Sequence, residues 1–124
     1  MCNHITKEYL RAHPKEVFVF GDNLLSKGYG GAAALRDEPN TYGFVTKRQP
    51  NNNPDSFYTV QEYNAVYVDE IAGLIKEIEE FPNFTYLISR LGAGLANKYL
   101  IFEKIIQPQI KNDLKQYKNV KFLW

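Results

Sequence analysis

Residues 17–36, VFVFGDNLLSKGYGGAAALR, determine how the rest of the chain is interpreted. The apolar run VFVF does not alternate with polar residues, which predicts a strand buried on both faces. After Gly-Asp-Asn come Gly28, Gly30 and Gly31, and the segment GGAAALRDE favours a helix that ends before Pro39. Glycines in this place have two explanations: close packing of a helix on a sheet, or a phosphate bound by backbone N–H groups.

The remaining sequence alternates expected helices and strands, with no internal repeat. Residues 48–56, RQPNNNPDS, predict a loop that is either the rim of a site or a solvated turn. The other expected elements are, in chain order, a helix over 5–13 capped by Thr6, a strand over 42–47, a helix over 68–81, a strand over 84–89, a helix over 99–117 interrupted near Pro108, and a strand over 120–124. This alternation predicts a single α/β domain over residues 1–124 with a mostly parallel sheet.

Composition narrows the classes of function. The 124 residues carry 15 Lys or Arg and 14 Asp or Glu, a net charge of +1, which gives no broad footprint for duplex nucleic acid. Cys2 is the only cysteine, which excludes an intrachain disulfide and a cysteine-built zinc site, and His4 and His13 lack metal-ligand spacing. No apolar stretch approaches the roughly 20 residues of a membrane span, and the first residues lack the apolar core of a signal peptide. We therefore expect a cytoplasmic monomer that uses no metal and no cofactor.

Two glycine-rich segments follow expected strands, where ligands bind in open parallel sheets. The first contains Gly28, Gly30 and Gly31, and the second contains Gly92 and Gly94 ahead of a helix expected near Tyr99. Two such loops on neighbouring strands could hold a diphosphate from both sides. Standard nucleotide motifs do not fit, because no Gly-Lys-Ser/Thr follows the glycines and no acidic residue ends the second strand.

Three motifs in this order, FGDNLL…GYGGAAALR, FVTKR and ISRLGAGLAN, resemble macro domains, the modules that bind ADP-ribose. The resemblance covers roughly residues 16–110. It is closest to a divergent branch that contains terminal ADP-ribose glycohydrolases and small phage and bacterial proteins. It implies a three-layer α/β/α fold, a nucleotide of the ADP-ribose type as ligand, and a role in NAD metabolism.

The resemblance also implies roles for individual residues. Asn23 matches an asparagine that meets the distal ribose, and Lys47 matches a lysine that attacks the anomeric carbon in the glycohydrolase branch. The two loops that match those around the distal ribose and the diphosphate contain Gly28, Gly30, Gly31, Gly92, Ala93, Gly94 and Leu95. In that branch an aspartate follows the second loop, but this chain has Ala96 there.

Four further charged residues have open interpretations. Asp22 either orients a water for catalysis or caps the turn after the strand. Arg36 and Asp37 could pair at the end of the glycine-rich helix, while Arg90 either contacts a phosphate or pairs with a carboxylate. We therefore count Asp22 and Arg90 among the ligand-binding candidates, and Asp22 and Lys47 as the candidate catalytic residues.

Three hypotheses follow for the function. The first is a module that binds, and thereby sequesters or processes, ADP-ribose or a related NAD-derived nucleotide. The second is a hydrolase that removes ADP-ribose from a modified macromolecule, or a phosphate from ADP-ribose 1″-phosphate. The third is an interaction domain without catalysis, in which the pocket is filled.

Overall fold

The computed structural model describes residues 4–124, so Cys2 lies outside the described part. Within it, one sheet contains four strands, all parallel, in the order β2-β1-β3-β4. The strands are β1 (Glu16–Asn23), β2 (Thr41–Lys47), β3 (Thr85–Ile88) and β4 (Val120–Phe122). The α/β class and the parallel sheet expected from the sequence are confirmed.

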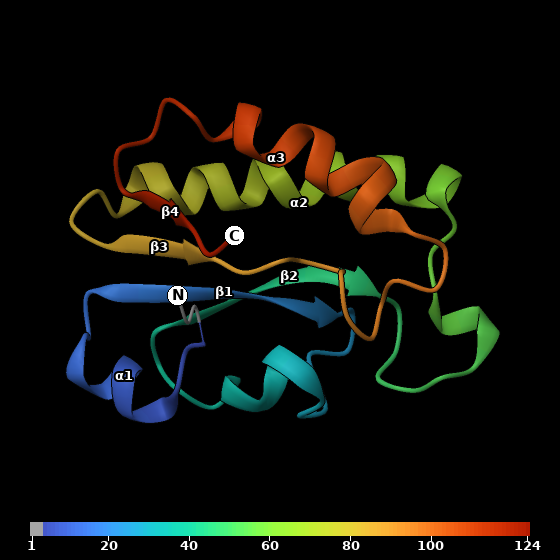
Figure 1. Cartoon of the computed structure of the whole chain (residues 1–124), viewed down its shortest axis with the longest axis horizontal. Helices are drawn as coiled ribbons and strands as arrows, with labels where there is room; N and C mark the ends of the chain where they lie inside the picture. Colours follow the sequence, from blue (N-terminus) through green and yellow to red (C-terminus); the bar gives the residue numbers. More distant parts are fainter. Residues whose placement is uncertain (1–3) are drawn as a thin grey trace.

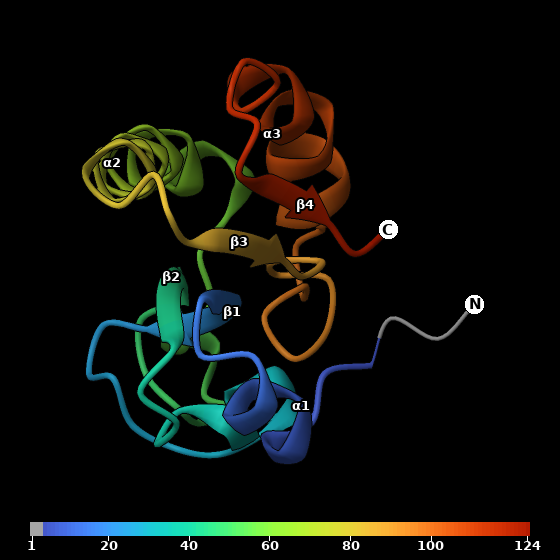
Figure 2. The ribbon, with the colours of Figure 1, turned by 90° about the vertical axis from the view of Figure 1, so that its left-hand side faces the viewer.

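Helices cover both faces of the sheet, so the chain forms three layers (Figures 1 and 2). Helices α2 (Val60–Glu80) and α3 (Gln107–Asp113) cover one face, whereas α1 (Lys7–Ala12) and the short helix η1 (Gly31–Leu35) cover the other. In β1, Val17 and Val19 belong to the apolar cluster on the first face, and Phe18 and Phe20 belong to the cluster on the second. This two-sided burial explains why the VFVF run does not alternate.

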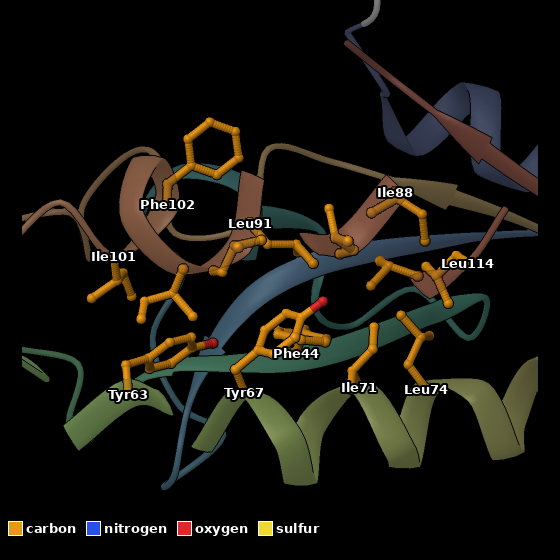
Figure 3. Packing of buried hydrophobic residues seen from close by; sticks show 14 of the residues in the cluster. Phe44, Tyr63, Tyr67, Ile71, Leu74, Ile88, Leu91, Ile101, Phe102 and Leu114 are labelled. Carbon is orange, nitrogen blue, oxygen red and sulfur yellow. The ribbon is translucent and has the colours of Figure 1, made fainter. Parts of the chain in front are cut away.

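The larger of the two clusters lies between the sheet and α2 (Figure 3). One side of α2 supplies Tyr63, Tyr67, Ile71, Leu74 and Ile78, spaced three or four residues apart, as an amphipathic helix requires. The helix begins eight residues before the segment predicted from the sequence. Its start is a capping box, in which Thr59 and Glu62 satisfy each other's backbone N–H groups.

The helix predicted over GGAAALRDE is present only in part. The structure has only the five-residue 3₁₀ helix η1 there, and its N-cap Gly30 has no side chain to bond the first N–H groups. Helix α1 with its Thr6 cap is confirmed, since the Thr6 hydroxyl accepts from Tyr9 N at 3.0 Å. The residues of η1 are mostly glycine and alanine, which have small side chains and therefore few packing contacts. The next residue, Arg36, has its partners outside η1, as described below.

The C-terminal helix restarts beside Pro108, as predicted, but without a break in the helical path. The π-helix η3 (Phe102–Ile106) leads directly into α3, and Gln107 N bonds to Phe102 O five residues earlier. The wider turn accommodates a proline that has no N–H to donate. No helix among residues 4–124 is long and apolar enough to span a bilayer.

Candidate functional site

The candidate site lies at the carboxyl ends of β1, β2 and β3. After β1 the chain turns to the face of η1, whereas after β3 it turns to the face of η3 and α3 (Figure 1). Loops that leave adjacent parallel strands toward opposite faces open a crevice in which ligands bind in α/β folds. A cavity of about 840 Å³ occupies this position, and pockets for small molecules typically measure roughly 300–1,000 Å³.

All the candidate site residues named from the sequence line this single cavity, although they come from the ends of β1 and β2 and from two glycine-rich segments. They are Asp22, Asn23, Gly28, Gly30, Gly31, Lys47, Arg90, Gly92, Ala93, Gly94 and Leu95.

The first glycine-rich loop, residues 24–31, is held by the side chain of Asn23, the last residue of β1. The amide of Asn23 donates to Lys27 O at 2.7 Å, and its oxygen accepts from Leu25 N at 3.0 Å. Asn23 therefore already serves the loop, in addition to any contact with a ribose. Within the described residues, the backbone N–H groups of Gly28, Tyr29 and Gly30 have no hydrogen-bond partner. Because η1 is a short 3₁₀ helix, these N–H groups, and not a helix dipole, are what the loop offers to an anion.

The second glycine-rich loop, residues 89–97, contacts the first. A Cβ on Gly30 would lie 2.9 Å from Leu95 Cδ1, so the Leu95 side chain rests on the first loop. Gly94, by contrast, faces open space, because a Cβ added there would have no neighbouring atom within 4 Å. The N–H groups of Gly94, Leu95 and Ala96 have no partner in the described part of the chain. The cavity is therefore bordered on two sides by unpaired backbone donors.

Lys47 ends β2 and is 9% exposed. Its ammonium donates to Asn51 O at 2.7 Å and lies 4.6 Å from the centre of the Phe57 ring. Burial lowers the pKa of Lys47 below its usual value, because the charged form loses hydration. The neighbouring Arg48 does not contribute to this shift, since it pairs with Glu62 at 2.7 Å and stacks on Tyr58.

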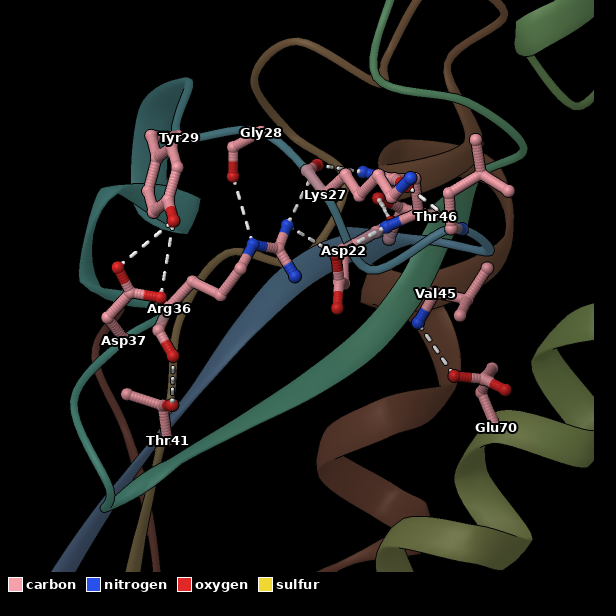
Figure 4. A network of polar contacts seen from close by, with 12 residues as sticks. Asp22, Lys27, Gly28, Tyr29, Arg36, Asp37, Thr41, Val45, Thr46 and Glu70 are labelled. Atoms are coloured by element: carbon pink, nitrogen blue, oxygen red, sulfur yellow. Dashed lines mark hydrogen bonds and ion pairs between the residues drawn. The ribbon is translucent and has the colours of Figure 1, made fainter.

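Asp22 is part of a buried ion pair (Figure 4). Its Oδ1 accepts from Arg36 at 2.7 Å and from Asn23 N at 2.8 Å. The predicted pair between Arg36 and Asp37 is wrong, since Asp37 accepts instead from the Tyr29 hydroxyl. Of the two interpretations of Asp22, the geometry favours organisation of the strand end.

The cations at the cavity have few anionic partners. Among residues 4–124 the ion pairs are Arg11–Glu38, Arg36–Asp22 and Arg48–Glu62. Arg90 is exposed and lies 5.1 Å from the centre of the Phe102 ring, so it stacks on an aromatic side chain and forms no ion pair within this range. Lys27, Lys47 and Arg90 thus line the cavity without a carboxylate at ion-pair distance in the described residues. The site carries an excess of positive charge.

Residues that the sequence analysis missed help to shape the site. A Cβ on Gly43 would lie 2.3 Å from Asp22 Oδ2, so this glycine makes room for the carboxylate. A Cβ on Gly21 would lie 3.2 Å from Thr46 Oγ1 and 3.5 Å from Gly92 N, where three segments converge. Glycine inside a strand is the available signal, because it often marks a close approach of this kind.

The polar loop over residues 48–56 is confirmed, with one 3₁₀ turn, η2 (Pro54–Ser56), inside it. Pro50, Asn51 and Asn52 line the cavity, so the loop is a rim of the site and not merely a solvated turn. Asn51 holds the loop closed: its backbone oxygen accepts from Lys47, and its side-chain oxygen accepts from the Ser56 hydroxyl and from Asn53 N.

Comparison with known proteins gives a family without a known activity. The model of a family of unknown function, DUF7831, matches residues 1–97. The chain belongs to this family. No curated protein and no solved structure matches the chain.

The DUF7831 match covers every residue that lines the cavity, since the last of these is Ala96. It ends at Asn97, whose side-chain oxygen accepts from Phe102 N, at the start of η3, at 3.1 Å. Among residues 4–124 there is no group of three or more His, Cys, Asp or Glu side chains arranged to hold a metal ion.

Proposed function

We propose that this DUF7831 protein is a macro-like domain that binds ADP-ribose, or a related NAD-derived nucleotide, in the cavity at the carboxyl ends of β1, β2 and β3. One observation carries the proposal: two loops with unpaired backbone N–H groups and three unpaired cations border one cavity of about 840 Å³ in the described part of the chain. A diphosphate with attached sugars fits this chemistry, because its oxygens accept from N–H groups and its charge offsets that of the cations.

The distribution of charge around the cavity supports an anionic ligand. The three loops, residues 24–31, 48–56 and 89–97, contain the cations Lys27, Arg48 and Arg90 and a single carboxylate, Asp55, which does not line the cavity. The whole chain is nearly neutral, so this local excess belongs to the site. Asp22, the nearest carboxylate, is neutralised by Arg36.

The open cavity argues against the hypothesis of an interaction domain with a filled pocket. That hypothesis requires large side chains where Gly28, Gly30, Gly31 and Gly94 stand. At Gly94, for example, a larger side chain would project into space that is open in this structure.

A hydrolase is the second candidate, and the environment of Lys47 favours it. A lysine nucleophile needs a share of neutral amine, and burial lowers the pKa of Lys47 in that direction. Ala96 supplies no carboxylate to assist it, and Asp22 is occupied by Arg36. The residues at the cavity therefore support nucleotide binding more strongly than catalysis.

The first experiment is calorimetric titration of the purified chain with ADP-ribose, with NAD, AMP and cyclic ADP-ribose as comparisons. We expect ADP-ribose to bind with roughly micromolar affinity, about −8 kcal/mol. Absence of binding to all four nucleotides would refute the proposal.

The variant Gly94→Val tests whether the cavity is the binding site. Gly94 has open space around it and no positive φ, so valine fits the fold but occupies the cavity. We expect an unchanged melting temperature and loss of ADP-ribose binding. Gly73→Ala on α2, outside the cavity, is the matched control and should bind normally. Normal binding by Gly94→Val would place the ligand elsewhere.

Lys47→Met tests the hydrolase. Methionine is an unbranched apolar side chain that removes the amine lying over the Phe57 ring. With an ADP-ribosylated substrate, or with ADP-ribose 1″-phosphate, we expect turnover to fall at least about a hundredfold while ADP-ribose still binds. Equal turnover in both proteins would exclude Lys47 as the nucleophile.

A further inference from the structure

Arg36 ends the GYGGAAALR motif and was not counted among the ligand-binding residues, yet its side chain reaches back to the first glycine-rich loop. It follows η1, and its guanidinium contacts three acceptors of that region (Figure 4). Nε donates to Gly28 O at 2.9 Å, while Nη2 donates to Lys27 O at 3.1 Å and to Asp22 Oδ1 at 2.7 Å. Lys27 O belongs to the Lys27–Gly28 peptide group and Gly28 O to the next one, where the glycine-rich part of the loop begins.

The surroundings of this guanidinium fix its position. The side chains of Arg36 and Asp22 are 13% and 8% exposed, and the guanidinium lies 5.4 Å from the centre of the Phe20 ring. Gly43 leaves the space that the Asp22 carboxylate occupies. Arginine offers several donors in a rigid plane, so one side chain can serve a carboxylate and two carbonyls at once, which the single ammonium of lysine cannot do in the same geometry.

The two hydrogen bonds to backbone carbonyls distinguish this arrangement from a simple ion pair. Lys27 O accepts from Asn23 on one side and from Arg36 on the other, so the loop is held between the end of β1 and the end of η1. The next three residues, 28–30, carry the N–H groups that border the cavity and have no partner among the described residues.

We propose that Arg36 is a positioning residue that holds the first glycine-rich loop in its ligand-binding conformation. Its effect on affinity rests on the proposed function, whereas its effect on the loop does not. The order of the loop is set before any ligand arrives, so a ligand encounters N–H groups that are already in place.

Limited trypsin digestion tests the effect on the loop without any ligand. Trypsin cleaves after Lys27, an exposed lysine. Arg36 holds the carbonyl of this scissile bond, Lys27 O, and the next carbonyl, Gly28 O. In Arg36→Gln, we expect the fragment ending at Lys27 to appear at least about tenfold faster than in the wild type, because cleavage follows local opening of the loop.

Two variants separate the loop from general stability. Arg11→Gln breaks another ion pair, with Glu38, that lies outside the cavity, and should leave cleavage after Lys27 unchanged. Asp22→Asn combined with Arg36→Gln removes the buried charge that Arg36→Gln alone would leave unpaired. Urea unfolding gives the global stability of each protein. Faster cleavage in the double variant at near wild-type stability supports the proposal, whereas cleavage that only follows global stability overturns it.

The substitution Arg36→Lys separates charge from geometry. A lysine retains the positive charge for Asp22 but not the simultaneous contacts to both carbonyls. We expect it to restore stability and to leave the Lys27–Gly28 bond more open than in the wild type. Full restoration of resistance to trypsin would show that charge alone is enough and would overturn the proposal.

ADP-ribose titration provides the second measurement. We expect Arg36→Gln to bind ADP-ribose about tenfold more weakly than the wild type, and Arg11→Gln to bind normally. Unchanged affinity in Arg36→Gln would show that the ligand does not depend on this loop. If the wild type itself does not bind, the proposed function fails, and the trypsin experiment still decides the role of Arg36.

Discussion

The two glycine-rich loops border the same cavity but are held in different ways. The first loop is held by polar side chains, with Asn23 and Arg36 bonded to its carbonyls. The middle of the second is held by apolar packing, because a Cβ on Gly92 would lie 3.3 Å from the Cδ1 atoms of Ile101 and Ile106. Hydrogen bonds of Ser89 and Asn97 fix only its two ends. The glycines of the first loop thus depend on polar anchors, and Gly92 in the second depends on the core.

The two explanations of the glycines, close packing and room for a phosphate, therefore apply to different positions. Gly92, with a φ of +80°, serves the backbone and the core. Gly94, two residues later, leaves space at the cavity. Gly28 and Gly31 also have positive φ values, whereas Gly30 does not. Packing and ligand binding therefore do not compete for the motif as a whole, since each glycine has its own function.

The largest expected effect comes from comparing Gly92→Ala with Gly94→Ala. Alanine at position 92 must adopt a left-handed conformation and press against two core isoleucines, which should lower the free energy of unfolding by about 3 kcal/mol. Alanine at position 94 meets nothing within 4 Å and should change it by no more than about 0.5 kcal/mol. Urea unfolding measures both values, and similar losses would contradict the division between core and cavity.

The sequence was enough to predict the sheet and the residues that line the cavity, but not the hydrogen bonds and ion pairs between those residues. Long apolar runs located β1 and β3, and the rule that ligands bind at the carboxyl ends of strands brought Asn23, Lys47 and Gly94 to one cavity. The partner of Arg36 could not be predicted, because its carboxylate lies 14 positions earlier and reaches it only through the fold. The helix expected over GGAAALRDE is limited to η1, Gly31–Leu35, whose N-cap Gly30 provides no side-chain cap.

The loop after β2 is also anchored by a polar contact, because Asn51 O accepts a hydrogen bond from the ammonium of Lys47. Burial lowers the pKa of Lys47, so between that pKa and 10.5 the unfolded chain retains a proton that the folded chain has released. The free energy of unfolding of the wild type, relative to Lys47→Met, should therefore rise as the pH increases through this window. Urea unfolding at pH 7 and at pH 10 checks the sign, with Lys104→Met, at an exposed lysine, as the control. A fall with pH would mean that contacts of the ammonium outweigh its burial.

The smallest effect is expected where the two loops touch. Gly30 has a φ of −75° and a ψ of 142°, which alanine adopts freely, and the atom in its way is the tip of Leu95, a side chain that is 63% exposed. Gly30→Ala should change the free energy of unfolding by at most about 0.5 kcal/mol, because Leu95 can move aside. A double-mutant cycle with Leu95→Ala measures the coupling between the loops. Coupling near zero would mean that each loop is held by its own anchors, polar in one and apolar in the other. A larger value would mean that the contact between Gly30 and Leu95 fixes the width of the cavity, so that the two loops act as one unit.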